Sequence, residues 1–258
     1  MNKILLHSFL FILSSAFLLP AQAEISTLSS AINKAGRQRM LSQRILKNHA
    51  LLGAAVDTLK ARQEMSDAIS LFDQQLSELK TYAPDANIKK ALAKVSELWP
   101  DYKRNVQQPP TKAHAMSLLD DSDELLRACH KVVLMLEDLS KTQAGHLVNI
   151  AGRQRMLSQR LSKLYIYQAW GFNNATIRSQ MNQAKNEFIG ALQEMKTAPV
   201  NNDKINRKLR AANQQWKLFK HGLDGVEKKP IPYIVNLTGN KLLKTMNELT
   251  HLYETVDK

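Results

Sequence analysis

The sequence predicts an all-α protein built from two tandem four-helix bundles. Ten consecutive residues, AGRQRMLSQR, occur at Ala35–Arg44 and again at Ala151–Arg160, so the chain contains an internal duplication. Aromatic residues make up 6% of the 258 residues, and glycine and proline number 9 and 8, a composition that favours helix. Apolar residues recur at spacings of three and four, and strand-type alternation is absent. Such amphipathic helices pack naturally as four-helix bundles.

The first 23 residues have the pattern of a secretory signal peptide. A positive start at Met1–Lys3 precedes the almost wholly apolar stretch Ile4–Leu19, and Ala21–Ala23 forms a small-x-small cleavage site. An uncleaved membrane anchor is the alternative interpretation. No later segment approaches the roughly 20 apolar residues that a membrane-spanning helix needs. We therefore expect an exported, soluble chain located in the periplasm.

After the signal peptide at residues 1–23, the duplication divides the chain into unit one (24–139) and unit two (140–258). Equivalent positions are 116 residues apart through the second helix and 117 apart from the third helix onward, so one residue has been gained in unit two. The pairs that show this are Asn33/Asn149, Met65/Met181, Phe72/Phe188, Trp99/Trp216 and Leu125/Leu242.

Each unit is expected to contain four helices, and the breaks between them fall in register. Breaks are expected after Gly53, at Ala83–Pro84 and at Gln107–Pro110 in unit one, and after Gly171, at Ala198–Pro199 and at Pro230–Pro232 in unit two. The fourth helices then start at about Thr111 and about Tyr233. The expected N-caps are Asp57, Asp85, Asn173–Asn174 and Asp203.

The junction between the units has two interpretations. No proline occurs from Thr111 to Trp170, and Gly145 inside a helix costs only about 1 kcal/mol. The fourth helix of unit one can therefore continue as the first helix of unit two, a helix roughly 87 Å long that stacks the bundles end to end. Alternatively, a turn near Ser140–Gly145 places them side by side. Helix propensity by itself favours the stacked rod.

Charge and cysteine content narrow the classes of partner. The formal net charge of +13 suits nucleic acid, acidic lipid or small anions, and export makes nucleic acid an unsuitable partner. Cys129 is the single cysteine, so no disulfide within the chain can form, and its apolar surroundings predict a buried structural thiol. The 235 residues after the signal peptide are enough to build a core without disulfides.

The repeated segment places an arginine in a stripe that otherwise resembles a contact between helices. On a helix, the residues of this face are Ile32, Gly36, Arg39, Gln43 and Leu46 in the first copy and Val148, Gly152, Arg155, Gln159 and Ser162 in the second. Glycine is unfavourable in the middle of a helix, so Gly36 and Gly152 indicate a close approach of two backbones. Met40, Leu41, Met156 and Leu157 are expected in the core.

Arg39 and Arg155 have no acidic partner on their own helices. No Asp or Glu occurs between Glu24 and Asp57, or between Asp138 and Glu187. An acid from another helix is one way to pair these arginines. A bound oxyanion is the other, because a guanidinium is a planar fork of donors that suits a planar oxyanion. Two facing arginines repel each other when empty and are bridged when an anion lies between them, so such a site can also act as a switch.

These residues carry a family resemblance. The segment Asn33–Arg44, NKAGRQRMLSQR, resembles the P-box of the PilJ-type sensor domain, the N-terminal region of type IV pilus chemotaxis transducers. This domain is similar to the periplasmic sensor of bacterial nitrate/nitrite histidine kinases. The resemblance implies a four-helix bundle that binds nitrate or nitrite where two P-box helices meet. The family's sensors are membrane-anchored with a cytoplasmic output domain, and we expect this exported chain to carry neither.

The resemblance and the stripe assign the same site residues. We expect Arg39, Arg155, Gly36 and Gly152 to form the anion site, supported by Asn33, Asn149, Gln43, Gln159, Arg37 and Arg153. Side-by-side bundles would let Arg39 meet Arg155 within one chain as a pseudo-dimer, whereas a stacked rod would need a homodimer. We expect no cofactor, no metal site and no catalytic residues, because the histidines are scattered without metal-ligand spacing.

Two functions are therefore carried forward. The first is a periplasmic sensor module for a small oxyanion, with nitrate or nitrite favoured. The second is a helical interaction protein that binds a membrane-bound transducer or a pilus component without a small ligand. The two are compatible, because an anion-loaded module can report to a membrane transducer. An enzyme is disfavoured, since no nucleophile motif, paired acids or phosphate loop is visible.

Overall fold

The computed structural model describes residues 25–225 and 230–256, and this part of the chain contains eight α-helices and no strand. The predicted signal peptide lies outside the described residues. Unit one contains α1 (Leu28–Gly53), α2 (Thr58–Tyr82), α3 (Ala86–Val106) and α4 (Lys112–Ser140), and unit two contains α5 (Gln143–Ala169), α6 (Ala175–Lys196), α7 (Asp203–Asp224) and α8 (Pro232–Glu254). The predicted helices and breaks are confirmed to within a few residues.

Short polar side chains begin the helices as expected, with two corrections. Asp85 accepts a hydrogen bond from the Ile88 N–H at 2.8 Å, and Asn174 accepts one from the Ile177 N–H at 2.9 Å. Asp57 occupies the N-cap position of α2, but its backbone is left-handed and its side chain makes no capping bond. The prediction for α7 was wrong by one residue, because Asn202 is the cap that accepts from the Ile205 N–H at 3.0 Å.

The predicted continuous helix across the junction is wrong. α4 ends at Ser140, Lys141 takes a left-handed conformation (φ 50°), and Thr142 caps α5 by accepting from the Gly145 N–H at 3.0 Å. A Cβ on Gly145 would lie only 2.3 Å from Ser140 Oγ, so glycine permits the chain to fold back tightly here. A capping threonine and this close contact therefore override the helix propensity of the surrounding residues.

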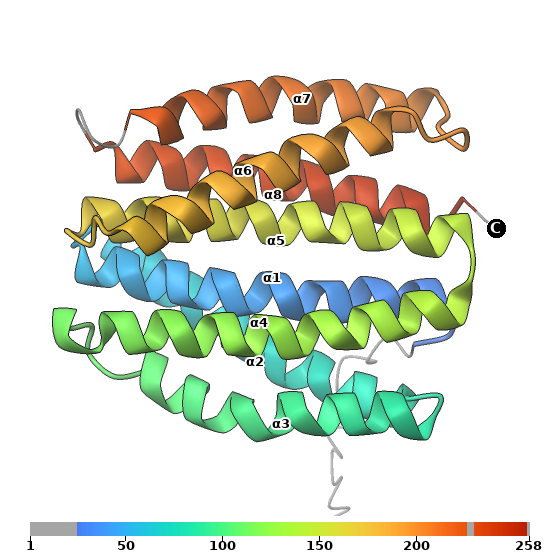
Figure 1. The fold of residues 1–258 in the computed structure, drawn as a ribbon, viewed down its shortest axis with the longest axis horizontal. Coiled ribbons are helices and arrows are strands. Elements are labelled where there is room, and N and C mark those ends of the chain that lie inside the picture. The colour runs from blue at the N-terminus through green and yellow to red at the C-terminus, as the bar shows by residue number, and fades with distance from the viewer. Residues whose placement is uncertain (1–24, 226–229, 257–258) are drawn as a thin grey trace, which may run out of the picture.

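The turn places the two bundles side by side rather than end to end. Figure 1 shows α1 and α5 in the middle of the molecule, both beginning at the right-hand end, so the two repeated helices run parallel. The other helices of unit one lie beyond α1, and those of unit two lie beyond α5. Gly53 packs against the ring of Trp170 at the far end of this pair.

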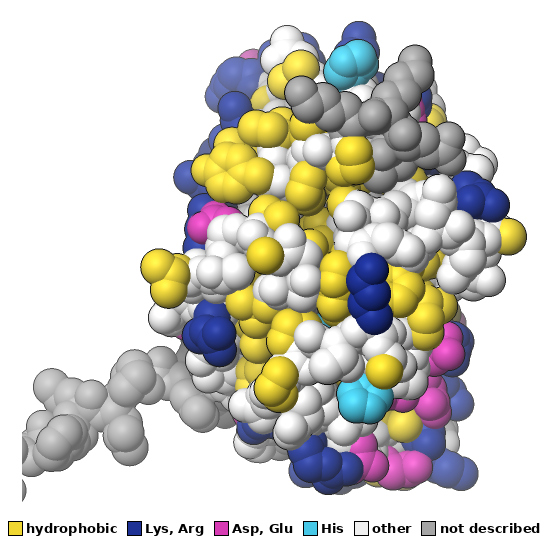
Figure 2. Space-filling model, turned by 90° about the vertical axis from the view of Figure 1, so that its left-hand side faces the viewer, with side chains coloured by type: hydrophobic (Ala, Val, Ile, Leu, Met, Phe, Trp, Pro, Cys, Tyr) yellow, Lys and Arg dark blue, Asp and Glu magenta, His cyan; other side chains and the backbone are white. Residues whose placement is uncertain are grey.

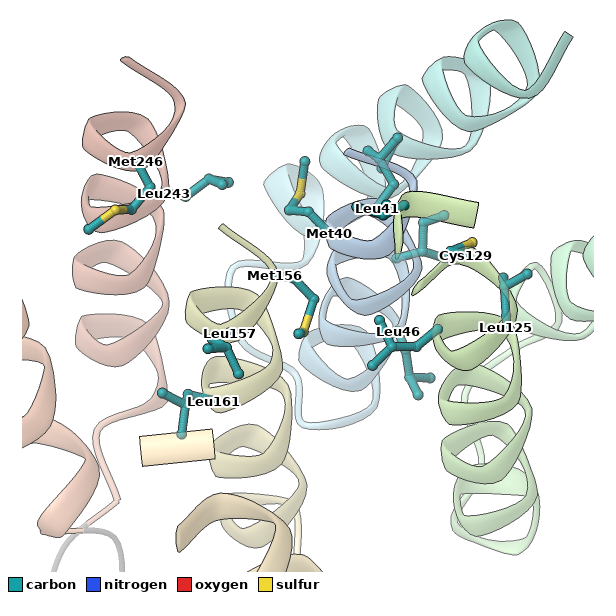
Figure 3. Packing of buried hydrophobic residues seen from close by; sticks show 14 of the residues in the cluster. Met40, Leu41, Leu46, Leu125, Cys129, Met156, Leu157, Leu161, Leu243 and Met246 are labelled. Carbon is teal, nitrogen blue, oxygen red and sulfur yellow. The ribbon is translucent and has the colours of Figure 1, made fainter. Parts of the chain in front are cut away.

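The core repeats along with the helices. Phe72 stacks on Trp99 with ring centroids 3.9 Å apart, and the equivalent Phe188 stacks on Trp216 at 4.1 Å. Figure 3 shows the apolar contacts around the central helices, where Met40, Leu41, Met156, Leu157 and Cys129 are all buried as predicted. Among the described residues, no helix has the length and apolar character needed to cross a bilayer.

Candidate functional site

The two repeated segments meet at Gly36 and Gly152, where the backbones of α1 and α5 lie close together at a pair of glycines. A Cβ built on Gly36 would lie 3.9 Å from the Gly152 Cα, and 3.3 and 3.4 Å from the Nη2 atoms of Arg155 and Arg39. A Cβ on Gly152 would lie 3.1 Å from Arg155 Nη2 and 3.6 Å from Arg39 Nη2. Both guanidinium groups therefore occupy the space that the glycines leave open.

Arg39 is fully buried and is held by residues of α4 and α5. Its Nη2 donates to the side-chain and main-chain oxygens of Asn149 at 2.7 and 3.3 Å, and its Nη1 donates to His130 Nδ1 at 3.0 Å. Because a guanidinium can only donate, His130 accepts with a neutral ring. Burial first, and then the charges of Arg39 and Arg153, lower the pKa of His130 to about 4.

Arg155 is placed in the same way from the other helix. Its Nη2 donates to the Asn33 carbonyl at 3.1 Å, and its Nη1 donates to Asn247 Oδ1 at 3.1 Å. His130 and Asn247 are equivalent positions of the fourth helices, so the site has approximate two-fold symmetry. Among the described residues, the Nε atoms of both Arg39 and Arg155 are buried without a hydrogen-bond partner.

No carboxylate of the described residues pairs directly with Arg39 or Arg155. The acid from another helix that the sequence left open as a partner is therefore not found among these residues. The nearest acids act through asparagines. Asn149 Nδ2 donates to Glu137, and Asn33 Nδ2 donates to the equivalent Glu254 at 2.7 Å. The asparagines thus separate each guanidinium from the negative charge instead of neutralising it, so the centre of the site keeps its positive charge.

The electrostatics of the site disfavour two charged arginines in the absence of an anion. Burial, followed by the charge of Arg153, lowers the pKa of Arg39 to about 9. Burial, followed by the charges of Arg37 and Arg39, places the pKa of Arg155 well below its ordinary value. Leaving buried cations without a counter-charge is unfavourable, so the pair is electrostatically suited to receive an anion.

The remaining predicted residues take different positions. Arg153 forms an ion pair with Glu187 at 2.8 Å, and Arg37 lies near Glu254 and Glu78, so both add positive charge at the edge of the site. Gln43 and Gln159 do not reach the arginines through their amide groups. Gln43 Nε2 instead donates to Ser122 Oγ at 3.1 Å on α4, while the Nε2 of Gln159 lies 3.5 Å from Ser158 Oγ.

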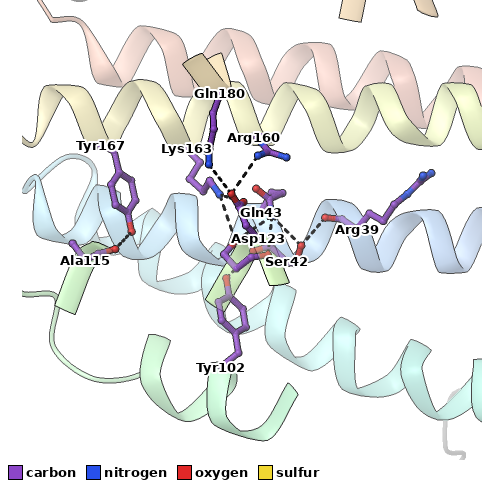
Figure 4. A network of polar contacts seen from close by, with 11 residues as sticks. Arg39, Ser42, Gln43, Tyr102, Ala115, Asp123, Arg160, Lys163, Tyr167 and Gln180 are labelled. Carbon is purple, nitrogen blue, oxygen red and sulfur yellow. Dashed lines mark hydrogen bonds and ion pairs between the residues drawn. The ribbon is translucent and has the colours of Figure 1, made fainter. Parts of the chain in front are cut away.

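A second polar layer lies further along α1 and α5, and the sequence did not predict it. Around Lys163 of unit two, Asp123 of α4 in unit one accepts hydrogen bonds from Lys163 Nζ and Arg160 Nη2, both at 3.2 Å, and from Gln180 Nε2 at 3.0 Å (Figure 4). Lys163 is fully buried, and its burial lowers the pKa of the ammonium group to about 8.

Unit one carries a matching layer. Glu64 Oε2 lies 3.5 Å from the fully buried Lys47 Nζ and 3.3 Å from Arg44 Nη2. Asn240 of α8 accepts from Lys47 at 3.0 Å and donates to Glu64 at 3.3 Å. Burial lowers the pKa of Lys47 to about 7. Each of these buried lysines has one carboxylate neighbour, unlike the arginines of the first layer.

His130 and Asn247 were missed by the sequence analysis, which grouped His130 with the scattered histidines. The two residues are 117 positions apart, as are Glu137 and Glu254. This spacing is the signal by which they could have been found, since polar residues occur at equivalent positions of the fourth helices. Within the described residues, no group of three or more His, Cys, Asp or Glu side chains is placed to hold a metal ion.

Comparison with known protein families matches both units of the chain. The family model "Type IV pili methyl-accepting chemotaxis transducer N-term" matches residues 23–123 and again residues 140–230, one match for each unit. Searches of curated proteins and of solved structures return no match. The two matched regions together cover more than half of the chain and include both repeated segments and both arginine positions.

Proposed function

We propose that this chain, which belongs to the family of type IV pili methyl-accepting chemotaxis transducer N-terminal domains, is a sensory module that binds a small oxyanion between Arg39 and Arg155. Nitrate and nitrite are the favoured ligands. The family is a sensory one, and its domain occurs twice in this chain, so each copy contributes one arginine to the proposed site. We further propose that the module works in the periplasm and reports to a membrane-bound transducer.

One observation carries the proposal. Two buried guanidinium groups reach the same pair of glycines, and neither has a carboxylate partner among the described residues. Hydrogen bonds to a charged group contribute about 1.5–3 kcal/mol each, so an anion that accepts from both arginines offsets much of the unfavourable burial. The buried Nε atoms supply donors that the protein itself leaves unused.

The geometry also suggests how binding becomes a signal. The Nη2 atoms of Arg39 and Arg155 lie 3.1–3.6 Å from the positions that Cβ atoms would take on Gly36 and Gly152. An anion between the two guanidinium groups must therefore shift the arginines, and with them the contact of α1 with α5. Arg39 would exchange the bonds that it donates to Asn149 and His130 for bonds donated to the anion. A small planar oxyanion needs less displacement than a tetrahedral one, which favours nitrate or nitrite over sulfate. Binding would then change the relative position of the two units.

Calorimetric titration with nitrate, nitrite, sulfate and chloride tests the proposal. We expect heat with nitrate or nitrite, and loss of that heat in Arg39→Ala and in Arg155→Ala without loss of helical content. Arg104→Ala is the matched control, because Arg104 is exposed and forms a surface ion pair with Asp101 on its own helix. An absence of heat with every anion at millimolar concentration would falsify the proposed ligand class.

A second candidate function rests on the same contacts. Asn149, His130, Asn33 and Asn247 already accept hydrogen bonds from the arginines, so the motif can serve to join the two bundles without any ligand. The chain would then be a helical adaptor for a membrane transducer or a pilus component. In that case partner binding, measured by co-purification, would be independent of nitrate and would survive the Arg39→Ala substitution.

A further inference from the structure

The outward face of α8 begins with exposed apolar side chains. Tyr233, Ile234 and Leu237 are 50%, 46% and 48% exposed, while Val235 between them is buried against the bundle. The same face continues with the exposed Lys241, and Lys244 follows one turn later. This surface, which we call the α8 face (Tyr233, Ile234, Leu237, Lys241 and Lys244), is therefore apolar in its first two turns and basic in the next two.

The duplicated helix α4 provides an internal comparison. The residues of α4 equivalent to Ile234, Leu237, Lys241 and Lys244 are Ser117, Asp120, Glu124 and Arg127, which are all exposed. The outward face of α4 is thus polar at the two positions where the α8 face has Ile234 and Leu237, and it carries an acid in place of Lys241, while Arg127 keeps the positive charge of Lys244. Because both helices keep the same buried side, the packing of the bundle does not explain the difference. Exposed apolar residues that the bundle does not need for its packing indicate that the α8 face is a contact surface.

Further apolar surface lies at the same end of the molecule. α2 and α8 both begin at the left-hand end in Figure 1, and Leu59 in the first turn of α2 is 85% exposed. Figure 2 views this end and shows hydrophobic side chains gathered across its upper and middle part, with a basic side chain near the centre and Lys and Arg, together with some Asp and Glu, along the edge. Apolar surface with a basic rim is typical of a protein surface that lies on an anionic membrane.

We infer that the α8 face, together with Leu59, docks this end of the molecule onto a bilayer that contains anionic phospholipid. Charge complementarity selects this occupant. The chain carries a net charge of +13, and the α8 face adds two lysines directly beside its apolar residues. A tyrosine with its hydroxyl in the headgroup layer, flanked by Ile and Leu that enter the acyl boundary, matches the side chains preferred at a membrane interface.

Vesicle co-sedimentation tests this inference, with phosphatidylcholine alone compared with phosphatidylcholine containing about a third phosphatidylglycerol. We expect the protein to pellet with the anionic vesicles and to be released by added salt. The double variant Ile234→Ser/Leu237→Asp, which gives α8 the residues of α4, should lose roughly tenfold in vesicle affinity. Every variant carries the same N-terminal segment, so any contribution of that segment to vesicle binding is common to the proteins that are compared.

The matched control is Leu134→Ser, which removes an apolar side chain of similar exposure (45%). Leu134 lies near the C-terminal end of α4, away from the α8 face. It should pellet like the unchanged protein. The inference is overturned if the unchanged protein stays in solution with anionic vesicles, or if the double variant pellets equally well. It is also overturned if the double variant changes the sedimentation coefficient without changing lipid binding, because a second copy of the chain then covers the α8 face.

Discussion

The polar layers around the buried Lys47 and Lys163, here called the lysine layers, each contain one carboxylate and one amide. The two layers differ in which helix position carries the carboxylate and which carries the amide. In unit one, Lys47 has its carboxylate from α2 (Glu64) and an amide from α8 (Asn240). In unit two, Lys163 has its carboxylate from α4 (Asp123), and α6 contributes the amide of Gln180 to that carboxylate. Glu64 and Gln180 are equivalent positions, and so are Asp123 and Asn240. Duplication has therefore preserved the charge of each layer rather than the identity of its residues.

The physical reason is the cost of an unpaired charge in the interior. A buried ammonium group without a carboxylate is strongly unfavourable. In each layer one acid contacts both the buried lysine and the neighbouring arginine, whichever helix supplies that acid. The acid in unit one comes from the same unit, whereas Asp123 crosses from unit one to unit two and so links the bundles.

The arginine layer differs from both lysine layers, and this is the more informative comparison. The chain places an acid beside each buried lysine, yet it places asparagines between Arg39 or Arg155 and the nearest acids. The fold is thus able to neutralise a buried cation where stability alone is at stake. The unneutralised arginine pair is consistent with a site whose counter-charge arrives from solution.

The largest effect is expected from Asp123→Asn. This change leaves Lys163 buried beside amides, and breaking a buried pair in this way destabilises a protein by about 3–5 kcal/mol. Adding Gln180→Glu gives unit two the arrangement of unit one and should restore most of the free energy of unfolding. Urea denaturation measures both variants.

Gln180→Glu alone is the control for this exchange. It places a second carboxylate beside Asp123 and should be mildly destabilising because like charges are then buried together. If the double variant is no more stable than Asp123→Asn, the two layers are not interchangeable, and the charge-conservation argument fails.

A smaller effect is expected at the glycine pair. Gly152→Ala brings a methyl group to 3.1 Å from Arg155 Nη2, a guanidinium already held by Asn33 and Asn247, and should destabilise the fold by about 1 kcal/mol. Gly190→Ala on α6 meets nothing within 4 Å and should stabilise by up to about 1 kcal/mol through helix propensity. Thermal unfolding of the two variants separates close packing from propensity, and equal gains at both positions would refute the close approach.

The last expected effect is a pH dependence of stability that arises from the lysine layers. The folded-state pKa values of Lys47 and Lys163 are lowered to about 7 and about 8 from the ordinary 10.5, so the unfolded chain binds more protons above pH 7. The free energy of unfolding should therefore rise with pH from about 7 to about 10, by up to about 1.4 kcal/mol per pH unit for each lysine. Lys47→Met should flatten the rise between pH 7 and 9. An unchanged slope would show that Lys47 keeps an ordinary pKa in the folded protein.

The helices and their core could be predicted from the sequence because these features are local. Periodicity selects the buried side of each helix, and caps and prolines set the ends, so the α1 and α5 stripes and the burial of Met40 and Met156 followed directly. The pairing of Gly36 with Gly152 and of Arg39 with Arg155 was also available, because the duplication makes a symmetric contact the natural arrangement.

The tertiary structure alone decided the features that depend on contacts between distant segments. The turn at Lys141 replaced the continuous helix, since a cap and a glycine contact outweigh average propensity. His130 reaches Arg39 across 91 positions, and Asp123 reaches Lys163 across 40, distances over which periodicity carries no information. The sequence by itself determined which faces are buried and where two cations lie unpaired on their helices. Only the packing of α2, α4 and α8 against α1 and α5 decided which cations receive an acid, because neutralisation depends on separation in space.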